Sequence, residues 1–136
     1  MSSVPQDPGH GADENPVISE LIDNVVDGVP GVIGAVIASA DGFVLGARLP
    51  EGADFDASAM AAMSAATLGL ANRLVQMGGD HAAEVCQFRS TNAQVWVFAV
   101  GVSAAVTIVA TAEADRARID LIGHEVANGL APLFDS

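Results

Sequence analysis

Few residues in this 136-residue sequence have the types and spacing that catalysis or metal binding would need. The most concentrated set is His81, Glu84 and Cys86, which His124 and Glu125 could join to hold a metal ion. The spacing matches neither CxxC nor HExxH, and Cys86 falls within a segment with strand character, where a thiol is usually packed and unreactive. We therefore expect solvated polar residues beside a buried thiol, with no metal and no cofactor.

Nucleotide-binding and nucleophilic motifs are missing as well. Gly28, Gly31 and Gly34 follow a GxxGxxG spacing, but there is no GxGxxG and no lysine for a phosphate-binding loop. A turn between a helix and a strand explains these glycines better. No GxSxG motif occurs, and helix capping explains Asp54 and Asp56 better than a catalytic carboxylate pair does. The sequence therefore predicts a protein that is not an enzyme.

Composition excludes further classes of function. The chain has 17 acidic and five basic residues, a formal net charge of −12, and 51% hydrophobic residues. Nucleic acids and anionic membranes select clustered positive charge, so neither is an expected partner. No apolar stretch approaches the roughly 20 residues of a membrane span, and no signal peptide is visible. A cytoplasmic location is expected, in agreement with the single cysteine.

The chain divides into a short tail and one domain. Residues 1–15 combine prolines, glycines and acids without apolar periodicity, so we expect a disordered tail before a domain over 16–136. Asn15 and Pro16 are suited to start a helix, as its cap and its first residue. Apolar residues then recur at three- and four-residue steps as far as Val29, which predicts one apolar helical face.

Strands are predicted on both sides of a second helix. A segment over 32–40 leads into Asp41-Gly42, which predicts a tight hairpin because glycine accepts a positive φ. Three more strands are expected near residues 83–90, 94–100 and 104–111. Short links make neighbouring strands pair antiparallel. Trp96 and Phe98 share one strand face and are expected in the core.

The longest predicted helix begins at Asp54 or Asp56 and continues to about Met77. It carries an apolar seven-residue repeat suited to packing on a sheet or on another helix. The repeat consists of Met60, Met63, Thr67, Leu70, Leu74 and Met77. A second stripe contains only small residues, Ala62, Ala65, Ala66 and Gly69, which allows another surface to approach closely or is simply good helix-forming sequence.

A final helix is expected to start near Thr111, with Glu113 and Asp115 favouring the positive end of its dipole, and to end at Pro132. The resulting order of elements predicts an α/β sandwich on an antiparallel sheet. The strand at 83–90 is a candidate for the sheet edge, where its unpaired backbone groups could bind a second copy across a twofold axis. Alternatively, charges such as Glu84 protect this edge.

The whole domain, from residue 16 to about residue 134, resembles the Roadblock family, named for a dynein light chain. The family includes bacterial MglB-type regulators of small Ras-like GTPases. The resemblance rests on VDGVPGVIGAVIASADGFVLGA, AMAAMSAATLGLANRLVQMGG, the strands ending in VTIVAT, and the last helix. The opening order of helix, PG, strand, DG and strand is its most specific part.

The resemblance implies a Roadblock/longin-like fold, in which a five-stranded antiparallel sheet lies between one long middle helix and two terminal helices. It also implies a homodimer with a continuous sheet and paired middle helices, which form the docking platform for the GTPase. Carried onto this sequence, the platform is Ala62, Ala65, Ala66, Gly69 and Arg73. The dimer interface is expected at Met63, Leu70, Val85, Gln87 and Arg89.

The leading hypothesis is therefore a non-enzymatic, dimeric regulator or scaffold of a bacterial Ras-like small GTPase, in a signalling module that can include a histidine-kinase-like protein. In MglB-like members, regulation proceeds by reshaping the GTPase without a donated arginine, so Arg73 is expected to be a surface residue, with an arginine finger as the minor alternative. Two other functions stay open. They are a small-molecule sensor of the PAS or GAF type, which needs an internal pocket, and a purely structural dimerisation subunit.

Overall fold

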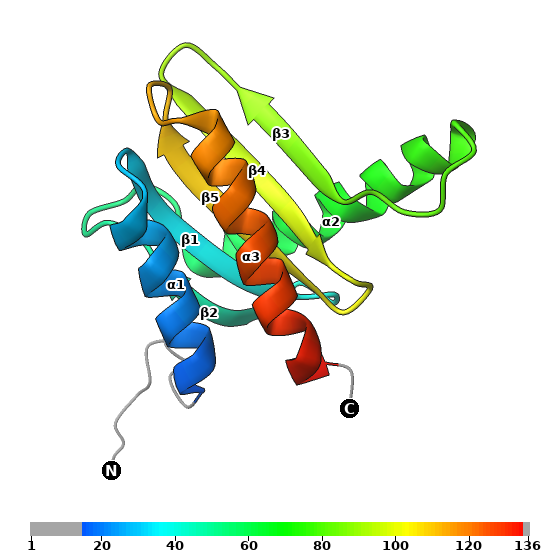
Figure 1. The fold of residues 1–136 in the computed structure, drawn as a ribbon, viewed down its shortest axis with the longest axis horizontal. Coiled ribbons are helices and arrows are strands. Elements are labelled where there is room, and N and C mark those ends of the chain that lie inside the picture. Colours follow the sequence, from blue (N-terminus) through cyan, green and yellow to red (C-terminus); the bar gives the residue numbers. More distant parts are fainter. Residues whose placement is uncertain (1–14, 135–136) are drawn as a thin grey trace.

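The computed structural model describes residues 15–134, which fold into three helices and five strands (Figure 1). The tail expected over residues 1–15 lies outside this range except for Asn15. The elements in chain order are α1 (Pro16–Gly28), β1 (Val32–Ser39), β2 (Val44–Arg48), α2 (Ala57–Met77), β3 (Val85–Arg89), β4 (Ala93–Val100), β5 (Ala104–Thr111) and α3 (Arg116–Phe134).

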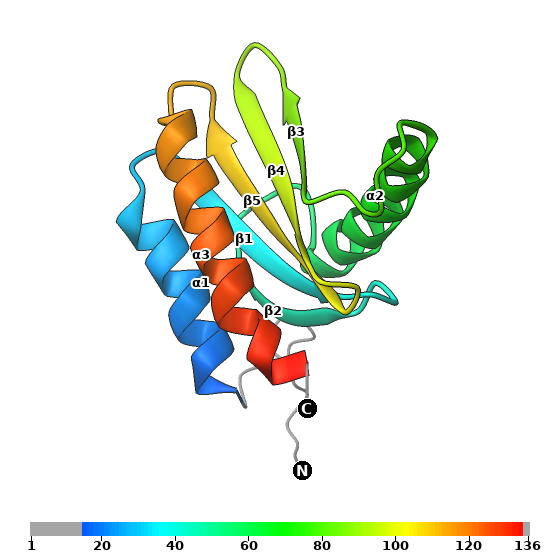
Figure 2. The same cartoon turned by 45° about the vertical axis from the view of Figure 1, so that its right-hand side comes forward.

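All five strands form one antiparallel sheet in the order β2-β1-β5-β4-β3. Helices α1 and α3 lie side by side on one face, and α2 crosses the other face (Figure 2). This arrangement confirms the predicted sandwich of one long middle helix and two terminal helices. Because β1, β5 and β4 occupy the interior of the sheet, β2 and β3 are left as the two edges.

The main core lies between the sheet and the α1/α3 pair. Its fully buried side chains include Ile37, Ile108, Ile119 and Leu130, which come from both the strands and α3. Trp96 and Phe98 stack within it, with ring centroids 5.8 Å apart, as the sequence predicted.

Gly123 allows α3 to lie close to the sheet. A Cβ atom at this position would overlap the buried ring of Phe98. Arg118, also on α3, donates a 3.0 Å hydrogen bond to the carbonyl of Gly28 at the end of α1. These contacts join the two terminal helices and the sheet into one packed unit.

One buried polar group orders the start of α3. Gln94, only 1% exposed, donates through Nε2 to the carbonyls of Thr111 and Ala114, both at 3.0 Å. Its Oε1 accepts a 2.8 Å hydrogen bond from Nε1 of Trp96. Both amide hydrogens and the oxygen of this side chain therefore have partners, as burial of a polar group requires.

The core beneath α2 is much smaller. Its buried residues are Val36, Ala38, Met60, Ala61 and Val109. Ser64, 4% exposed, hydrogen-bonds both the Met60 carbonyl and the hydroxyl of Thr107 on β5, which joins the helix to the central strands. The buried residues of α2 all lie in its first half, and its second half projects past the edge strand β3 (Figures 1 and 2).

Local sequence signals account for most helix starts and turns. Asn15 Oδ1 accepts from the backbone of Val17 at 2.9 Å, and Asp56 Oδ1 accepts from Ala59 at 2.6 Å, so both act as helix caps. The predicted turn at Asp41-Gly42 is present, with Gly42 at φ +89°. A Cβ on Gly42 would also press on the α2 backbone at Ala62, so this glycine lets the hairpin approach the helix.

Two predicted boundaries of the last helix are wrong. The helix begins at Arg116 rather than near Thr111, because Gln94 holds the carbonyls of Thr111 and Ala114 in a turn and Asp115 supplies the cap. Pro132 lies inside the helix, which continues to Phe134. A proline lacks only its own amide, and the two residues after Pro132 still have theirs, so the last turn can continue past it.

Candidate functional site

The predicted platform residues lie on the outward surface of α2. Ala62, Ala66, Gly69 and Arg73 are exposed, and Ala65 is half-buried beside them. Nothing lies within 4 Å of the position that a Cβ on Gly69 would take, so this stretch of helix is open to another molecule. The structure thus brings the five residues together along one uncovered surface.

A shallow groove borders this surface on the side of the hairpin turns. Its volume is about 150 Å³, and α2 contributes Ala65, Leu68, Gly69 and Asn72 to it. The opposite wall comes from Ser39 and Ala40 at the end of β1 and from the β4–β5 turn. The backbone amide of Ala40 donates to the carbonyl of Ser103 at 2.8 Å, so the two hairpin ends form one wall.

Exposed apolar side chains stand at both hairpin turns. Phe43 is 70% exposed and Val102 is 87% exposed. Val102 lines the groove, and Phe43 follows Gly42, which touches α2. Sequence reasoning missed these two residues, although a large apolar residue within each predicted turn, DGF and GVS, was a usable signal.

The same helix carries an apolar ridge, which we call the α2 ridge. It consists of Met63, Leu70, Leu74 and Met77, which are 60–86% exposed. Of the predicted seven-residue repeat, Met60 packs on the sheet, whereas the ridge residues face solvent. Exposed side chains at this spacing provide a seam suited to a second helix. Met63 and Leu70 of the expected dimer interface belong to this ridge.

Strand β3 forms the edge of the sheet next to the α2 overhang, as the sequence suggested. Val85 is half-buried and packs towards α1 and α3, while Gln87 and Arg89 are exposed. On the α2 face of the strand, Phe88 is 51% exposed beside the half-buried Cys86. The remaining residues of the expected dimer interface therefore lie along one open edge.

The candidate reactive residues are not arranged for chemistry. Burial raises the pKa of the Cys86 thiol, which favours the protonated, weakly nucleophilic form. His124 packs edge-on against Phe98, and its Nδ1 lies 2.8 Å from the Asp120 carbonyl. Within residues 15–134, no group of three or more His, Cys, Asp or Glu side chains could hold a metal ion.

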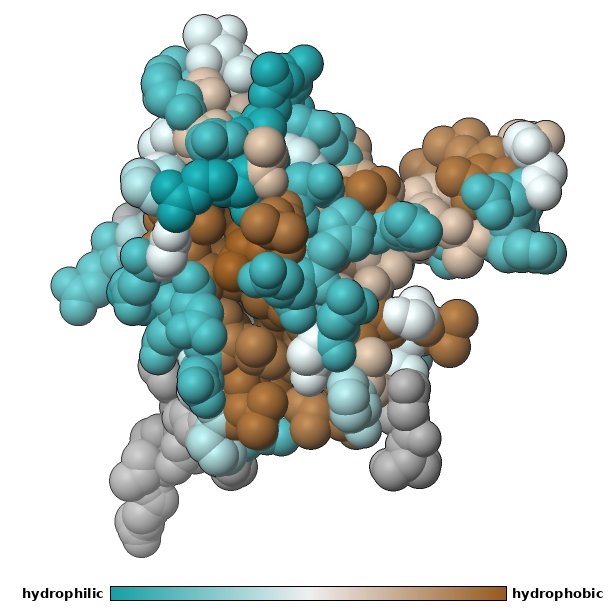
Figure 3. Space-filling view, viewed as in Figure 1, coloured by the Kyte–Doolittle hydropathy of each residue, from teal (hydrophilic) through white to brown (hydrophobic). Residues whose placement is uncertain are grey.

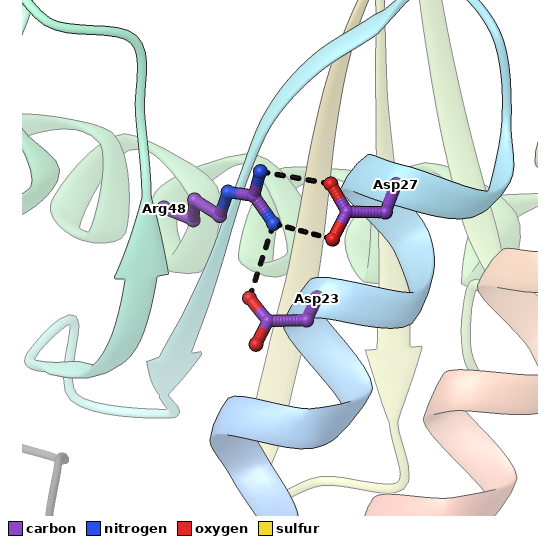
Figure 4. A network of polar contacts seen from close by, with 3 residues as sticks. All are labelled: Asp23, Asp27 and Arg48. Atoms are coloured by element: carbon purple, nitrogen blue, oxygen red, sulfur yellow. Dashed lines mark hydrogen bonds and ion pairs between the residues drawn. The ribbon is translucent and has the colours of Figure 1, made fainter.

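An ion-pair network at the opposite edge of the sheet has a structural role. Arg48 on β2 contacts Asp27 at 2.8 Å and Asp23 at 3.2 Å, both on α1 (Figure 4). The hydrogen bond from Arg48 lowers the pKa of Asp27. Because the network is exposed and lies on the α1 side of the sheet, it fastens α1 to the β2 edge and leaves the outward surface of α2 unaffected.

The outer face of α1 and α3 differs from the α2 surface. It is largely hydrophilic, with an apolar strip along the line where the two helices pack together (Figure 3). Its exposed large apolar residues are Val17, Leu121 and Leu133. No helix within residues 15–134 is both long and apolar enough to span a membrane.

The sequence matches the Roadblock/LC7 domain over residues 18–111, from α1 to the end of β5. This match covers well over half of the chain. The chain belongs to the Roadblock/LC7 family. None of the curated proteins matches the sequence significantly.

Solved Roadblock/LC7 structures have the same fold. The domain from Streptomyces avermitilis is 20% identical, with a TM-score of 0.77 over 86% of this chain and 97% of its own. MglB from Myxococcus xanthus is 11% identical, with a TM-score of 0.81 over 90% and 98%. MglB from Thermus thermophilus is 17% identical, with a TM-score of 0.75 over 96% and 93%. At these identities the likeness establishes the Roadblock/LC7 fold alone.

Proposed function

We propose that this Roadblock/LC7 protein is a non-catalytic, homodimeric regulator or scaffold of a bacterial Ras-like small GTPase. The observation that carries the proposal is the uncovered outer surface of α2, which combines small residues with exposed apolar side chains. The protein has the fold of MglB, and MglB-type Roadblock proteins regulate small Ras-like GTPases. The platform is Ala62, Ala65, Ala66, Gly69 and Arg73, extended by Phe43 and Val102.

The chemistry of the surface suits a protein partner. Exposed apolar side chains gathered on one face mark interaction sites, and the core of an interface is depleted of charge. The platform has a single charged residue, Arg73, which can bind an acidic group on the partner. Small residues such as Ala66 and Gly69 allow a partner's backbone to come close.

Dimerisation supports the same function, because two copies paired through β3 would bring their α2 helices together as one platform. The α2 ridge supplies the apolar seam, and Val85, Gln87 and Arg89 supply the strand edge. Regulation then works by shaping the GTPase, with Arg73 as a contact residue. A histidine-kinase-like protein is a further candidate partner in the same signalling module.

The groove beside α2 does not itself suit a small-molecule sensor site. Ligand pockets generally have volumes of roughly 300–1,000 Å³ and enclose most of their ligand. The groove beside α2 has about 150 Å³ and is walled mainly by small residues. It fits one partner side chain better than a metabolite.

The test is GTP hydrolysis and nucleotide exchange by candidate Ras-like GTPases from the same organism, with and without this protein. We expect a change in at least one rate, or nucleotide-dependent binding. The Ala66→Arg and Gly69→Glu variants should weaken that effect by about tenfold or more while remaining folded, because a bulky charge at a close contact is expensive to desolvate. Leu121→Arg, on the exposed surface of α3, is the matched control and should act like the wild type. Unchanged rates and no binding for any GTPase would reject the proposal.

A further inference from the structure

The groove beside α2 begins where the side chains of the sheet become short. A row of three alanines crosses neighbouring strands on the α2 face, because Ala38 of β1 and Ala99 of β4 both pair with Ala105 of β5. Two residues further along β5, Thr107 hydrogen-bonds Ser64, so helix and sheet are in contact there. The alanine row is too short to reach the helix in the same way, and the space above it stays open.

The helix side of the groove is small as well. Ala65 and Gly69 lie over the floor formed by Ala99 and Ala105, and no charged residue lines the groove. Its volume is about 150 Å³. A cavity of about this volume holds a benzene ring. Short side chains above and below leave a flat slot, which suits a planar ring better than a branched aliphatic chain.

One amide group makes the groove selective. Asn72 is the last of the α2 residues that line it. Its Oδ1 accepts a 2.7 Å hydrogen bond from the backbone amide of Ala83, which fixes the orientation of the side-chain amide, since a backbone amide can only donate. Within residues 15–134, Nδ2 of Asn72 makes no hydrogen bond. The groove therefore offers an apolar slot with a hydrogen-bond donor at one end.

We propose that this groove binds one tyrosine side chain of the partner protein. The ring lies between the alanine row and α2, and its hydroxyl oxygen accepts a hydrogen bond from Nδ2 of Asn72. The inference rests on the proposed function and names the residue type that anchors the partner. Ala65 and Gly69 belong to both the groove and the platform, so a partner seated on the platform reaches the groove. Tyrosine combines an apolar ring with a polar end and is enriched at protein interfaces.

Binding of phenol, the ring and hydroxyl of tyrosine, tests the site without any partner. We expect phenol to bind with a dissociation constant of roughly 1–10 mM, as its few atoms allow. In ¹⁵N-resolved NMR spectra, the shifts should be confined to residues of the groove, including the side-chain amide of Asn72. Benzene lacks the hydroxyl and cyclohexanol has a puckered ring, so each should bind about threefold or more weakly.

A pair of leucine variants provides the control. Ala65→Leu fills the groove and should abolish phenol binding, whereas Ala66→Leu, on the neighbouring exposed position, should bind phenol like the wild type. Gly69→Leu is a second filling variant, because a Cβ at this position meets no atom within 4 Å. Circular dichroism checks that each variant is folded.

Three results would overturn the proposal. They are the absence of phenol shifts at the groove, equal binding of benzene or cyclohexanol, and unchanged phenol binding by a folded filling variant. None of these measurements uses a GTPase, so failure of the tyrosine site and failure of the regulatory function are separately visible.

Discussion

Beneath α1 and α3 the sheet is buried along its length, whereas on the opposite face α2 covers only the strands under its first half. The first face combines Trp96, Phe98 and Leu130 with a fully bonded Gln94. The second has a small core and leaves the α2 ridge in solvent. One sheet therefore has a face that stabilises the fold and a face available for partners.

This difference between the faces predicts where sequence changes affect stability and where they affect association. Buried apolar area is the main source of folding free energy, so the α1/α3 face carries most of it. Exposed apolar residues contribute little to the folding of one chain, and their contribution appears when a second molecule covers them.

The largest expected effect is the unfolding caused by a charge in the small core beneath α2. Val36 is fully buried in the central strand β1, so Val36→Asp would bury an unpaired carboxylate and should unfold the domain. Ile33→Asp is the control, since Ile33 on the same strand is 42% exposed and should tolerate the change. Circular dichroism measures whether each variant is folded. A folded Val36→Asp protein would show that the core beneath α2 tolerates a buried carboxylate.

A matched leucine pair compares the two faces. Leu130 is fully buried under α3, so Leu130→Ala should cost about 2–5 kcal/mol of unfolding free energy. Leu70 is 60% exposed on the α2 ridge, and Leu70→Ala should change stability by about 0.5 kcal/mol or less. Urea unfolding at low protein concentration measures both, and equal costs would contradict the division between the faces.

A matched glycine pair should give effects of opposite sign. Gly123→Ala forces a Cβ into the Phe98 ring and should destabilise the protein by about 1–3 kcal/mol. Gly69→Ala meets no atom and should stabilise it by about 0.5–1 kcal/mol, because alanine favours the helix. Thermal unfolding reports both shifts. The same sign for both would mean that the close approach of α3 is not maintained in solution.

The smallest expected effect lies at the exposed contact between α1 and β2. Since Arg48 lowers the pKa of Asp27 from its usual 3.8, the carboxylate stabilises the folded state above that pH and loses this contribution as the pH falls through the lowered pKa. Asp27→Asn should therefore be slightly less stable than the wild type at neutral pH, with the difference vanishing once the pH falls below the lowered pKa. High salt should shrink it as well, and a difference independent of pH and salt would assign the effect to packing.

Local interactions made much of this fold predictable from the sequence. Asn15 and Asp56 cap helices through bonds to residues two or three positions away, and Gly42 makes its turn through its own backbone freedom. The strand positions follow from runs of β-branched residues, and short links decide that they pair antiparallel. The start of α3 was missed because the Gln94 amide, distant in sequence, holds the residues that precede it.

Tertiary structure alone decided which surface of α2 stays open. The seven-residue repeat suits a sheet or another helix equally well, and only the crossing of α2 over β5 and past β3 separates Met60, which is buried, from Leu70, which is not. The exposure of Phe43 and Val102 and the open edge of β3 likewise depend on strand order and register. Sequence determines elements through contacts between near neighbours, whereas a binding surface is what remains uncovered after distant elements have packed.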